Sequence, residues 1–127
     1  DAVTVGIDFT ARDLQSRFRA GGLPWELSKC FDGSAAIGRF MPLEQLGGDV
    51  QRLDFRLDID GCEVQHGHTA DMLHRVDDII AYVSRFMTLK MGDLLFTGTP
   101  AGVGPVAIVQ HLQGYLGDEN VLGFYIR

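Results

Sequence analysis

The chain has 127 residues, 46% of them hydrophobic, which suits one domain with a buried core. Its formal net charge of −6 argues against non-specific nucleic-acid binding and against docking on anionic membranes. The apolar runs are too short for a transmembrane helix, and no signal-peptide pattern is visible, so we expect a cytoplasmic protein. Cys30 and Cys62 are expected to be free thiols, with a disulfide as the alternative.

The first predicted elements are a strand and a short helix. Apolar and polar residues alternate over residues 3–9, which predicts a strand with Asp8 on the face opposite to the apolar side chains. Thr10 begins a capping-box pattern, so a helix is expected over about 11–19, where a glycine pair then stops it.

A hairpin is predicted in the middle of the chain. Residues 23–36 indicate mainly loop, and a short strand is expected over 37–41. Residues 52–59 then alternate strictly between charged and apolar side chains. Asp60-Gly61 favours a type I′ turn, after which residues 62–65 can return as the partner strand.

The last third of the chain combines a helix with short strands. Apolar residues at helical spacing predict the one substantial helix within about 70–88. A buried strand is expected over 94–97, followed by a glycine- and proline-rich loop over 97–105. Two terminal strands are predicted near 111–116 and 121–126. The elements together indicate a β-rich α+β fold.

A few polar residues are candidates for chemistry, each with a simpler alternative. Asp8 lies within a predicted strand, where a buried carboxylate needs a metal ion or a basic partner; a salt bridge to Arg12 is the simpler explanation. Arg12 and Gln15 share one face of the predicted helix. This face could bind an anion, or it could be an ordinary solvent-exposed face. Lys29 is either functional or merely exposed.

Two further segments have the same ambiguity. The loop over 97–105 lacks the Gly-Lys-Ser/Thr of a P-loop, but its backbone amides could bind a carboxylate; an ordinary tight turn is the alternative. His66 and His68 would share one face of a strand and could bind a metal ion with Asp71, although coincidence is the simpler interpretation.

Five segments in order resemble four motifs of the fumarylacetoacetate hydrolase family, because the helix motif is matched in two segments. Residues 6–15 match Gly-x-Asp-x-Thr-Ala-Arg-Asp-x-Gln, and residues 24–32 match Pro-Trp-x-x-x-Lys-x-Phe-Asp. The helix segments 69–72 and 80–89 and the loop 92–105 are also similar to the family's sequence. The resemblance covers almost the whole chain and implies a mixed β-roll with one main helix, which is usually dimeric and binds Mg²⁺ or Mn²⁺.

The resemblance also implies roles for single residues. Asp8 matches a metal ligand, Lys29 the active-site lysine, and Arg12, Gln15 and Thr99 match substrate-contacting positions. In the family, the other metal ligands form a Glu-x-Glu pair upstream of this region, and the lid also lies upstream. This sequence contains no Glu-x-Glu. We therefore expect the chain to be the C-terminal part of a single catalytic domain.

The implied activity is metal-dependent cleavage of a carbon–carbon bond in an acylpyruvate, such as fumarylpyruvate, through a pyruvate enolate. The same residues would suit an oxaloacetate or related oxo-acid decarboxylase or isomerase, because these reactions pass through a similar enolate. A third possibility is a catalytically silent fragment that contributes only fold and dimer interface. The expected partners are a small oxo acid and a second copy of the chain, with no nucleic acid or membrane.

Overall fold

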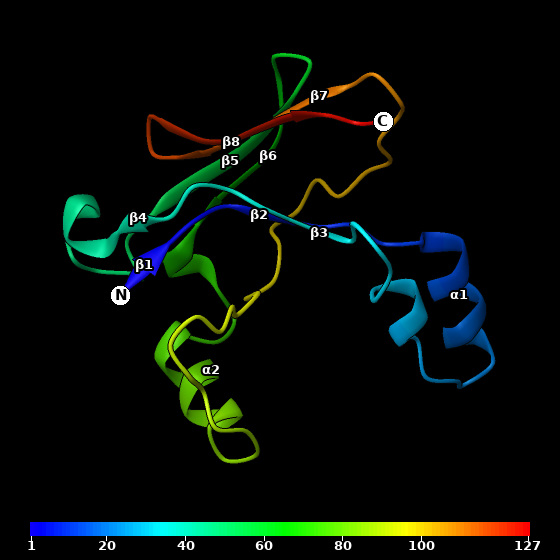
Figure 1. Ribbon diagram of the computed structural model, residues 1–127, viewed down its shortest axis with the longest axis horizontal. Helices are drawn as coiled ribbons and strands as arrows, with labels where there is room; N and C mark the ends of the chain where they lie inside the picture. The colour runs from blue at the N-terminus through cyan, green and yellow to red at the C-terminus, as the bar shows by residue number, and fades with distance from the viewer. The chain divides into compact units, whose positions relative to one another are not determined.

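The computed structural model describes residues 1–127, which divide into two compact units (Figure 1). The larger unit joins Asp1–Val5 to Gly38–Arg127, and the smaller unit is Gly6–Ile37. Short antiparallel strands and two helices make up an α+β, β-rich fold, as the sequence predicts. No helix combines the length and the apolar character that crossing a membrane requires.

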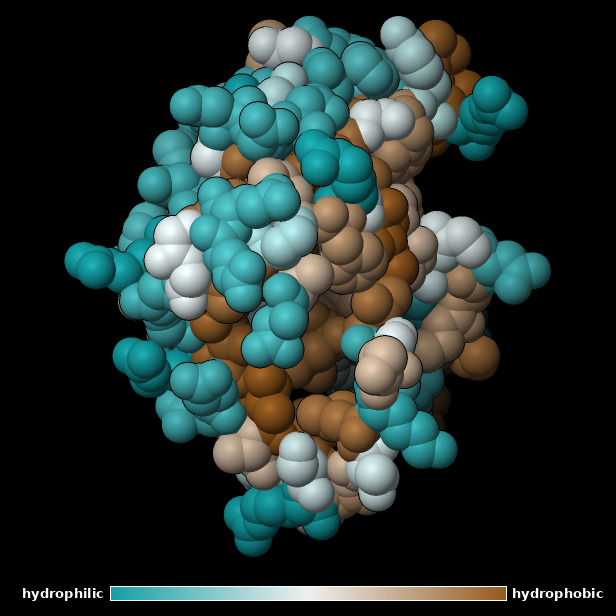
Figure 2. Space-filling view, turned by 60° about the vertical axis from the view of Figure 1, so that its left-hand side comes forward, coloured by the Kyte–Doolittle hydropathy of each residue, from teal (hydrophilic) through white to brown (hydrophobic).

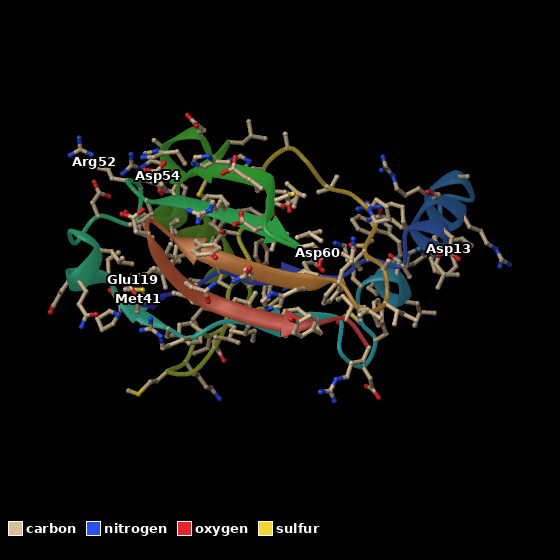
Figure 3. The ribbon with its side chains drawn as sticks, turned by 90° about the horizontal axis from the view of Figure 1, so that it is seen from above. Asp13, Met41, Arg52, Asp54, Asp60 and Glu119 are labelled. Carbon is tan, nitrogen blue, oxygen red and sulfur yellow. The ribbon has the colours of Figure 1, made fainter.

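A four-stranded antiparallel sheet forms the centre of the larger unit. Its strands are β5 (Asp54–Ile59), β6 (Cys62–His68), β7 (His111–Leu116) and β8 (Glu119–Tyr125), in the spatial order β6-β5-β7-β8. Asp60 lies at the tip of the β5–β6 hairpin (Figure 3), and the φ angles of 52° at Asp60 and 79° at Gly61 confirm the predicted type I′ turn. The terminal strands are confirmed, although β8 begins two residues earlier than expected.

A small ladder packs against one end of this sheet. Strand β1 (Ala2–Val3) pairs with β4 (Met41–Pro42), which leads into the 3₁₀ turn η2 (Leu43–Leu46). A Cβ atom on Gly38 would lie only 2.6 Å from the Val121 carbonyl, so glycine allows the chain to pass close to β8. The core of the unit is small: its centre is Met41, Leu116 and Val121, with Val3, Val5, Leu46 and Phe55 around it.

The helix expected over 70–88 is much shorter in the structure. Helix α2 spans Val76–Val83, preceded by the 3₁₀ turn η3 (Thr69–Asp71). The buried side chain of Gln51 explains the late start, because its Nε2 donates to the Thr69 carbonyl (2.6 Å) while its Oε1 accepts from the Val76 amide (2.7 Å). Hydrophobic spacing cannot reveal a helix cap that is supplied from another segment.

The strand expected over 94–97 is absent. Leu94, Leu95 and Phe96 are 50%, 37% and 45% exposed in an irregular segment. An apolar run forms a strand only where a neighbouring strand pairs with its backbone, and no strand of the chain does so here.

The smaller unit is built on a second two-stranded ladder. Strand β2 (Gly6–Asp8) pairs antiparallel with β3 (Ala35–Ile37), and between them lie α1 (Arg12–Ala20) and the 3₁₀ turn η1 (Glu26–Ser28). The single strand expected over 3–9 is therefore divided between β1 and β2, and that expected over 37–41 between β3 and β4. With nine residues, α1 is as substantial as the eight-residue α2, so the prediction of one main helix is wrong.

Many large hydrophobic side chains reach the surface, where Figure 2 shows them as extensive brown areas. Within and after α2, Tyr82, Phe86 and Met87 are 62%, 68% and 66% exposed. Leu73, in the segment where a helix was expected to bury it, is 96% exposed. Exposed apolar area on this scale is typical of a surface that another protein segment covers.

Candidate functional site

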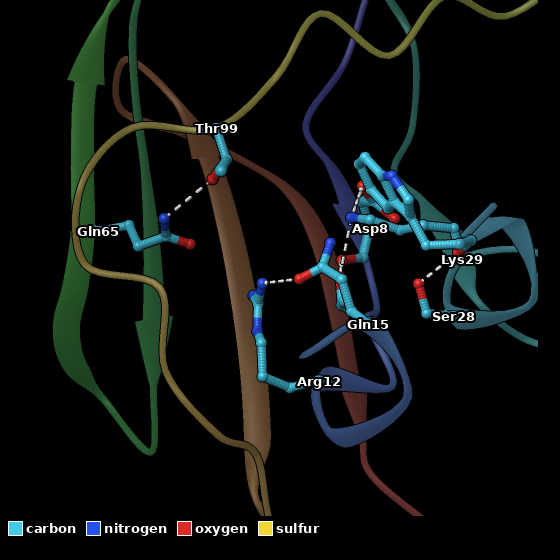
Figure 4. A network of polar contacts seen from close by, with 9 residues as sticks. Asp8, Arg12, Gln15, Ser28, Lys29, Gln65 and Thr99 are labelled. Atoms are coloured by element: carbon cyan, nitrogen blue, oxygen red, sulfur yellow. Dashed lines mark hydrogen bonds and ion pairs between the residues drawn. The ribbon is translucent and has the colours of Figure 1, made fainter. Parts of the chain in front are cut away.

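Lys29 and Asp8 form an ion pair within the smaller unit (Figure 4). Lys29 Nζ donates to Asp8 Oδ2 at 2.6 Å and to Thr10 Oγ1 at 2.8 Å. A lysine ammonium has three N–H donors, so one donor remains without a partner in the chain. The Lys29 side chain is 29% exposed and that of Asp8 50%, which leaves both accessible to a small molecule.

The backbone around Lys29 is held by Ser28. This residue is fully buried, its hydroxyl donates to the Trp25 carbonyl, and its own carbonyl accepts from the Ala11 amide at 2.9 Å. The turn that precedes Lys29 is thereby tied to the residue directly before α1. Lys29 is thus placed by local hydrogen bonds rather than left as a freely exposed side chain.

Thr10 has a different role from the predicted helix cap. The N-cap residue of α1 is Ala11, with no side-chain hydrogen bond to the helix. The Thr10 hydroxyl instead accepts from Lys29 and donates to the Asp8 carbonyl at 3.3 Å. The capping box is therefore wrong, because the ammonium of Lys29 competes for the same hydroxyl.

Arg12 and Gln15 form a second polar pair on α1. Arg12 Nη1 donates to Gln15 Oε1 at 2.6 Å, which confirms that the two residues share one helix face. Gln15 is only 7% exposed and anchors the more exposed Arg12. The guanidinium keeps four further N–H donors, a number and geometry that suit a carboxylate. The salt bridge considered between Asp8 and Arg12 is not formed, since Asp8 pairs with Lys29.

A cavity of about 380 Å³ lies beside this network in the smaller unit. Trp25 and Lys29 contribute to its lining, which also includes Pro24, Glu26 and Cys30. Space of this size next to a charged donor can receive a small organic acid. Cys30 is a free thiol, as is Cys62, which confirms that expectation.

Thr99 belongs to the larger unit, where Gln65 of β6 holds it. Gln65 Nε2 donates to Thr99 Oγ1 at 3.0 Å (Figure 4). The backbone amides of Gly98, Thr99, Ala101 and Gly102 have no acceptor in the chain. This loop therefore offers free donors of the kind that bind a carboxylate, while a role for Thr99 in one common site with Lys29 stays a prediction.

His66 and His68 both lie in β6 but do not form a metal site. The His66 ring lies between Asp54 and Glu63, at 3.8 Å and 3.5 Å, and His68 Nδ1 accepts from the Ala70 amide. No three His, Cys, Asp or Glu side chains of the chain are grouped so as to hold a metal ion. The simpler interpretation of the histidines is the better one.

Asp8 fits a divalent cation as one ligand of a larger set. Its Oδ1 has no partner in the chain, and a carboxylate oxygen is the ligand type that Mg²⁺ and Mn²⁺ prefer. One half-exposed carboxylate does not displace the waters of Mg²⁺ effectively, so the residues of this chain do not form a complete metal site.

Three residues of this network are not singled out by sequence patterns. Ser28 is a small polar residue in a loop, Thr10 has the features of a cap, and Gln65 is one polar position of an alternating strand. Their contacts join residues 17 to 36 positions apart in the chain, so only the fold reveals them.

Comparison with known proteins places these features in one family. Residues 1–126 match the family model described as fumarylacetoacetate (FAA) hydrolase C-terminal. An oxaloacetate tautomerase of Escherichia coli is 45% identical over 102 residues, covering 80% of this chain and 47% of that protein. A mitochondrial oxaloacetate tautomerase of Bos taurus is 44% identical over 121 residues, covering 95% and 53%.

A solved structure is also similar to this chain. Fumarylpyruvate hydrolase from Pseudomonas aeruginosa, crystallised with Mn²⁺ and pyruvate, superposes with a TM-score of 0.89 at 38% identity, covering 98% of this chain and 53% of that one. The chain spans about half the length of the curated relatives it matches. By the family model, the sequence identities and the shared fold, the chain belongs to the fumarylacetoacetate hydrolase family.

Proposed function

We propose that this chain provides the lysine and the carboxylate-binding groups of an oxaloacetate tautomerase. The observation that carries the proposal is the Lys29 ammonium, which Asp8 and Thr10 hold with one N–H donor left over. The names of the tautomerase relatives, at 44–45% identity, favour this alternative over the acylpyruvate hydrolase that the sequence first suggested.

The geometry suits a reaction that moves a proton without breaking a carbon–carbon bond. In the keto form of oxaloacetate, one proton leaves C3 and one proton arrives at the C2 oxygen, so atoms and charges balance. The free donor of Lys29 would stabilise negative charge on that oxygen as the enolate develops. Because Asp8 and Thr10 fix the ammonium beforehand, little reorganisation is needed during the reaction.

The other predicted residues would bind the two carboxylates of the substrate. Arg12, anchored by Gln15, presents a planar group of donors suited to one carboxylate. Thr99 and the free amides beside it suit the other carboxylate. A divalent cation, of which Asp8 would be one ligand, supplies Lewis-acid polarisation of the oxo group when it is bound.

The test uses the full-length gene product with Mg²⁺ or Mn²⁺. A tautomerase should speed the loss of the ultraviolet absorbance of enol-oxaloacetate and the exchange of the C3 protons in D₂O, without release of pyruvate. Lys29→Met should lower both rates by about 10²–10⁴-fold. Exchange no faster than in buffer would refute the proposal, and rapid pyruvate release from oxaloacetate would identify a decarboxylase instead.

Acylpyruvate cleavage is the second candidate function. It is supported by the fumarylpyruvate hydrolase whose fold and sequence are similar to this chain. Hydrolysis requires an attacking water, whereas tautomerisation does not, so release of pyruvate together with a second acid from an acylpyruvate distinguishes the two.

We also retain the homodimer as a proposal, because the exposed hydrophobic residues around α2 need a partner surface. Gel filtration with light scattering of the same protein tests it.

A further inference from the structure

The glycine loop, residues 97–105, is attached to β6 by a single side chain. Gln65 Nε2 donates to Thr99 Oγ1 at 3.0 Å, to the Pro100 carbonyl at 3.2 Å and to the Ala101 carbonyl at 3.3 Å. Gln65 is partly buried on β6, the edge strand of the four-stranded sheet. One amide group therefore binds three consecutive residues of a segment that has no regular structure.

Two glycines allow the glycine loop to lie directly against β6. A Cβ atom on Gly67 would be 3.1 Å from Pro100 Cβ, and a Cβ atom on Gly102 would be 2.3 Å from the Val64 carbonyl. Gly102 also has a φ of +96°, which other residues rarely adopt. The loop is thus in close contact with the sheet on both sides of the Gln65 hydrogen bonds.

The direction of the Gln65–Thr99 hydrogen bond determines what Thr99 can do. The Gln65 amide nitrogen is the donor, so the Thr99 oxygen accepts and its own O–H proton stays available. The Pro100 and Ala101 carbonyls are likewise occupied by Gln65, while the neighbouring amides are free. Gln65 in this way occupies three oxygen atoms of the loop and leaves the Thr99 hydroxyl proton and these amides unused, and an anion requires such donors.

We propose that Gln65 is a positioning residue that makes the Thr99 hydroxyl and the adjacent backbone amides into a preorganised carboxylate-binding group. The proposal rests on the proposed function only for the identity of the ligand, a 2-oxo acid. The attachment of the loop by Gln65 is a property of the larger unit alone and can be measured without catalysis.

The first experiment measures the loop itself in the full-length protein. Gln65→Glu keeps the size of the side chain but replaces the donor with a carboxylate, which would repel the Pro100 and Ala101 carbonyl oxygens. Backbone ¹⁵N order parameters at residues 98, 99, 101 and 102 should fall from about 0.85 to below about 0.6. Gln45→Glu is the matched control, because Gln45 is exposed in η2 and has no side-chain hydrogen bond. Unchanged order parameters in Gln65→Glu would overturn the proposal.

The second experiment asks whether Gln65 acts through Thr99. Gln65→Glu and Thr99→Val should each weaken pyruvate or oxalate binding about tenfold in calorimetry, and the double variant no more than either single one. Gln65→Met, which is neutral, should behave in the same way if the charge of Glu disturbs folding. Fully additive losses would overturn positioning through Thr99. If the wild-type protein binds neither acid, the proposed function fails, and the order parameters still decide the role of Gln65.

Discussion

Removing the ammonium of Lys29 should separate activity from stability. Lys29→Met keeps the length of the side chain and deletes the donor that Asp8 and Thr10 hold. Because the two side chains of the ion pair are 29% and 50% exposed, solvent screens their attraction, and the pair should contribute less than about 1 kcal/mol to the free energy of unfolding. The melting temperature should therefore fall by no more than about 4 °C.

The expected loss of activity is much larger. A charged donor that acts on a developing enolate is worth about 10²–10⁴-fold in kcat, or about 2.7–5.5 kcal/mol of the barrier. The assay is C3 proton exchange of oxaloacetate with saturating metal, and kcat should fall while KM changes little. Lys90→Met is the matched control, since Lys90 is the only other lysine of the chain and its exposed side chain makes no hydrogen bond or ion pair.

Two results would refute this reasoning. If kcat is kept and only KM rises, Lys29 binds the substrate but does not act on the enolate. If the activity is lost together with cooperative unfolding, the network around Lys29 is structural. Asp8→Asn distinguishes the metal from the lysine, because it should weaken Mn²⁺ binding while Lys29→Met should not.

Three further outcomes follow from other contacts. Gln51→Ala would leave the Val76 amide unpaired and remove one of the two donors to the Thr69 carbonyl, and it should cost about 1–3 kcal/mol in urea denaturation, most of it at the start of α2. Gly102→Ala should displace the glycine loop and weaken pyruvate binding in calorimetry, whereas Gly104→Ala, with nothing within 4 Å of its Cβ, should not. The 127-residue chain alone should show no micromolar Mg²⁺ or Mn²⁺ binding in calorimetry, because Asp8 is its single suitable ligand.

Two features of the local structure were predicted well from local patterns in the sequence. The β5–β6 hairpin follows from the alternation over 52–59 and from Asp60-Gly61, whose positive φ angles the turn requires. Helix α1 and its end at Gly21 follow in the same way. These features depend on residues that are neighbours in the chain, so spacing alone is sufficient to identify them.

Features that depend on distant contacts were not predictable in this way. Gln51 caps a helix that begins 25 residues later, and Gln65 holds residues 34 to 36 positions away. Lys29 and Asp8 are 21 positions apart, and only the family resemblance suggested that they act together. The strand expected over 94–97 needed a partner that this chain does not provide, so its hydrophobic composition was misleading.

The organisation of the polar groups by unit leads to a last prediction. Lys29 is held entirely by residues of Gly6–Ile37, and Gln65 holds Thr99 entirely within the larger unit, so the two side chains share no partner. The losses of unfolding free energy in Lys29→Met and Gln65→Glu should therefore add within about 0.5 kcal/mol in the double variant.

Turnover should behave differently, because groups that act on one bound substrate are strongly non-additive. In kcat/KM for oxaloacetate, the double variant should lose clearly less than the product of the two single losses. Additive stability with non-additive turnover would support the proposal that Lys29 and Thr99 both bind the substrate. If the losses of unfolding free energy and of kcat/KM are both additive, the glycine loop binds some other ligand. The role of Lys29 would then not depend on the glycine loop.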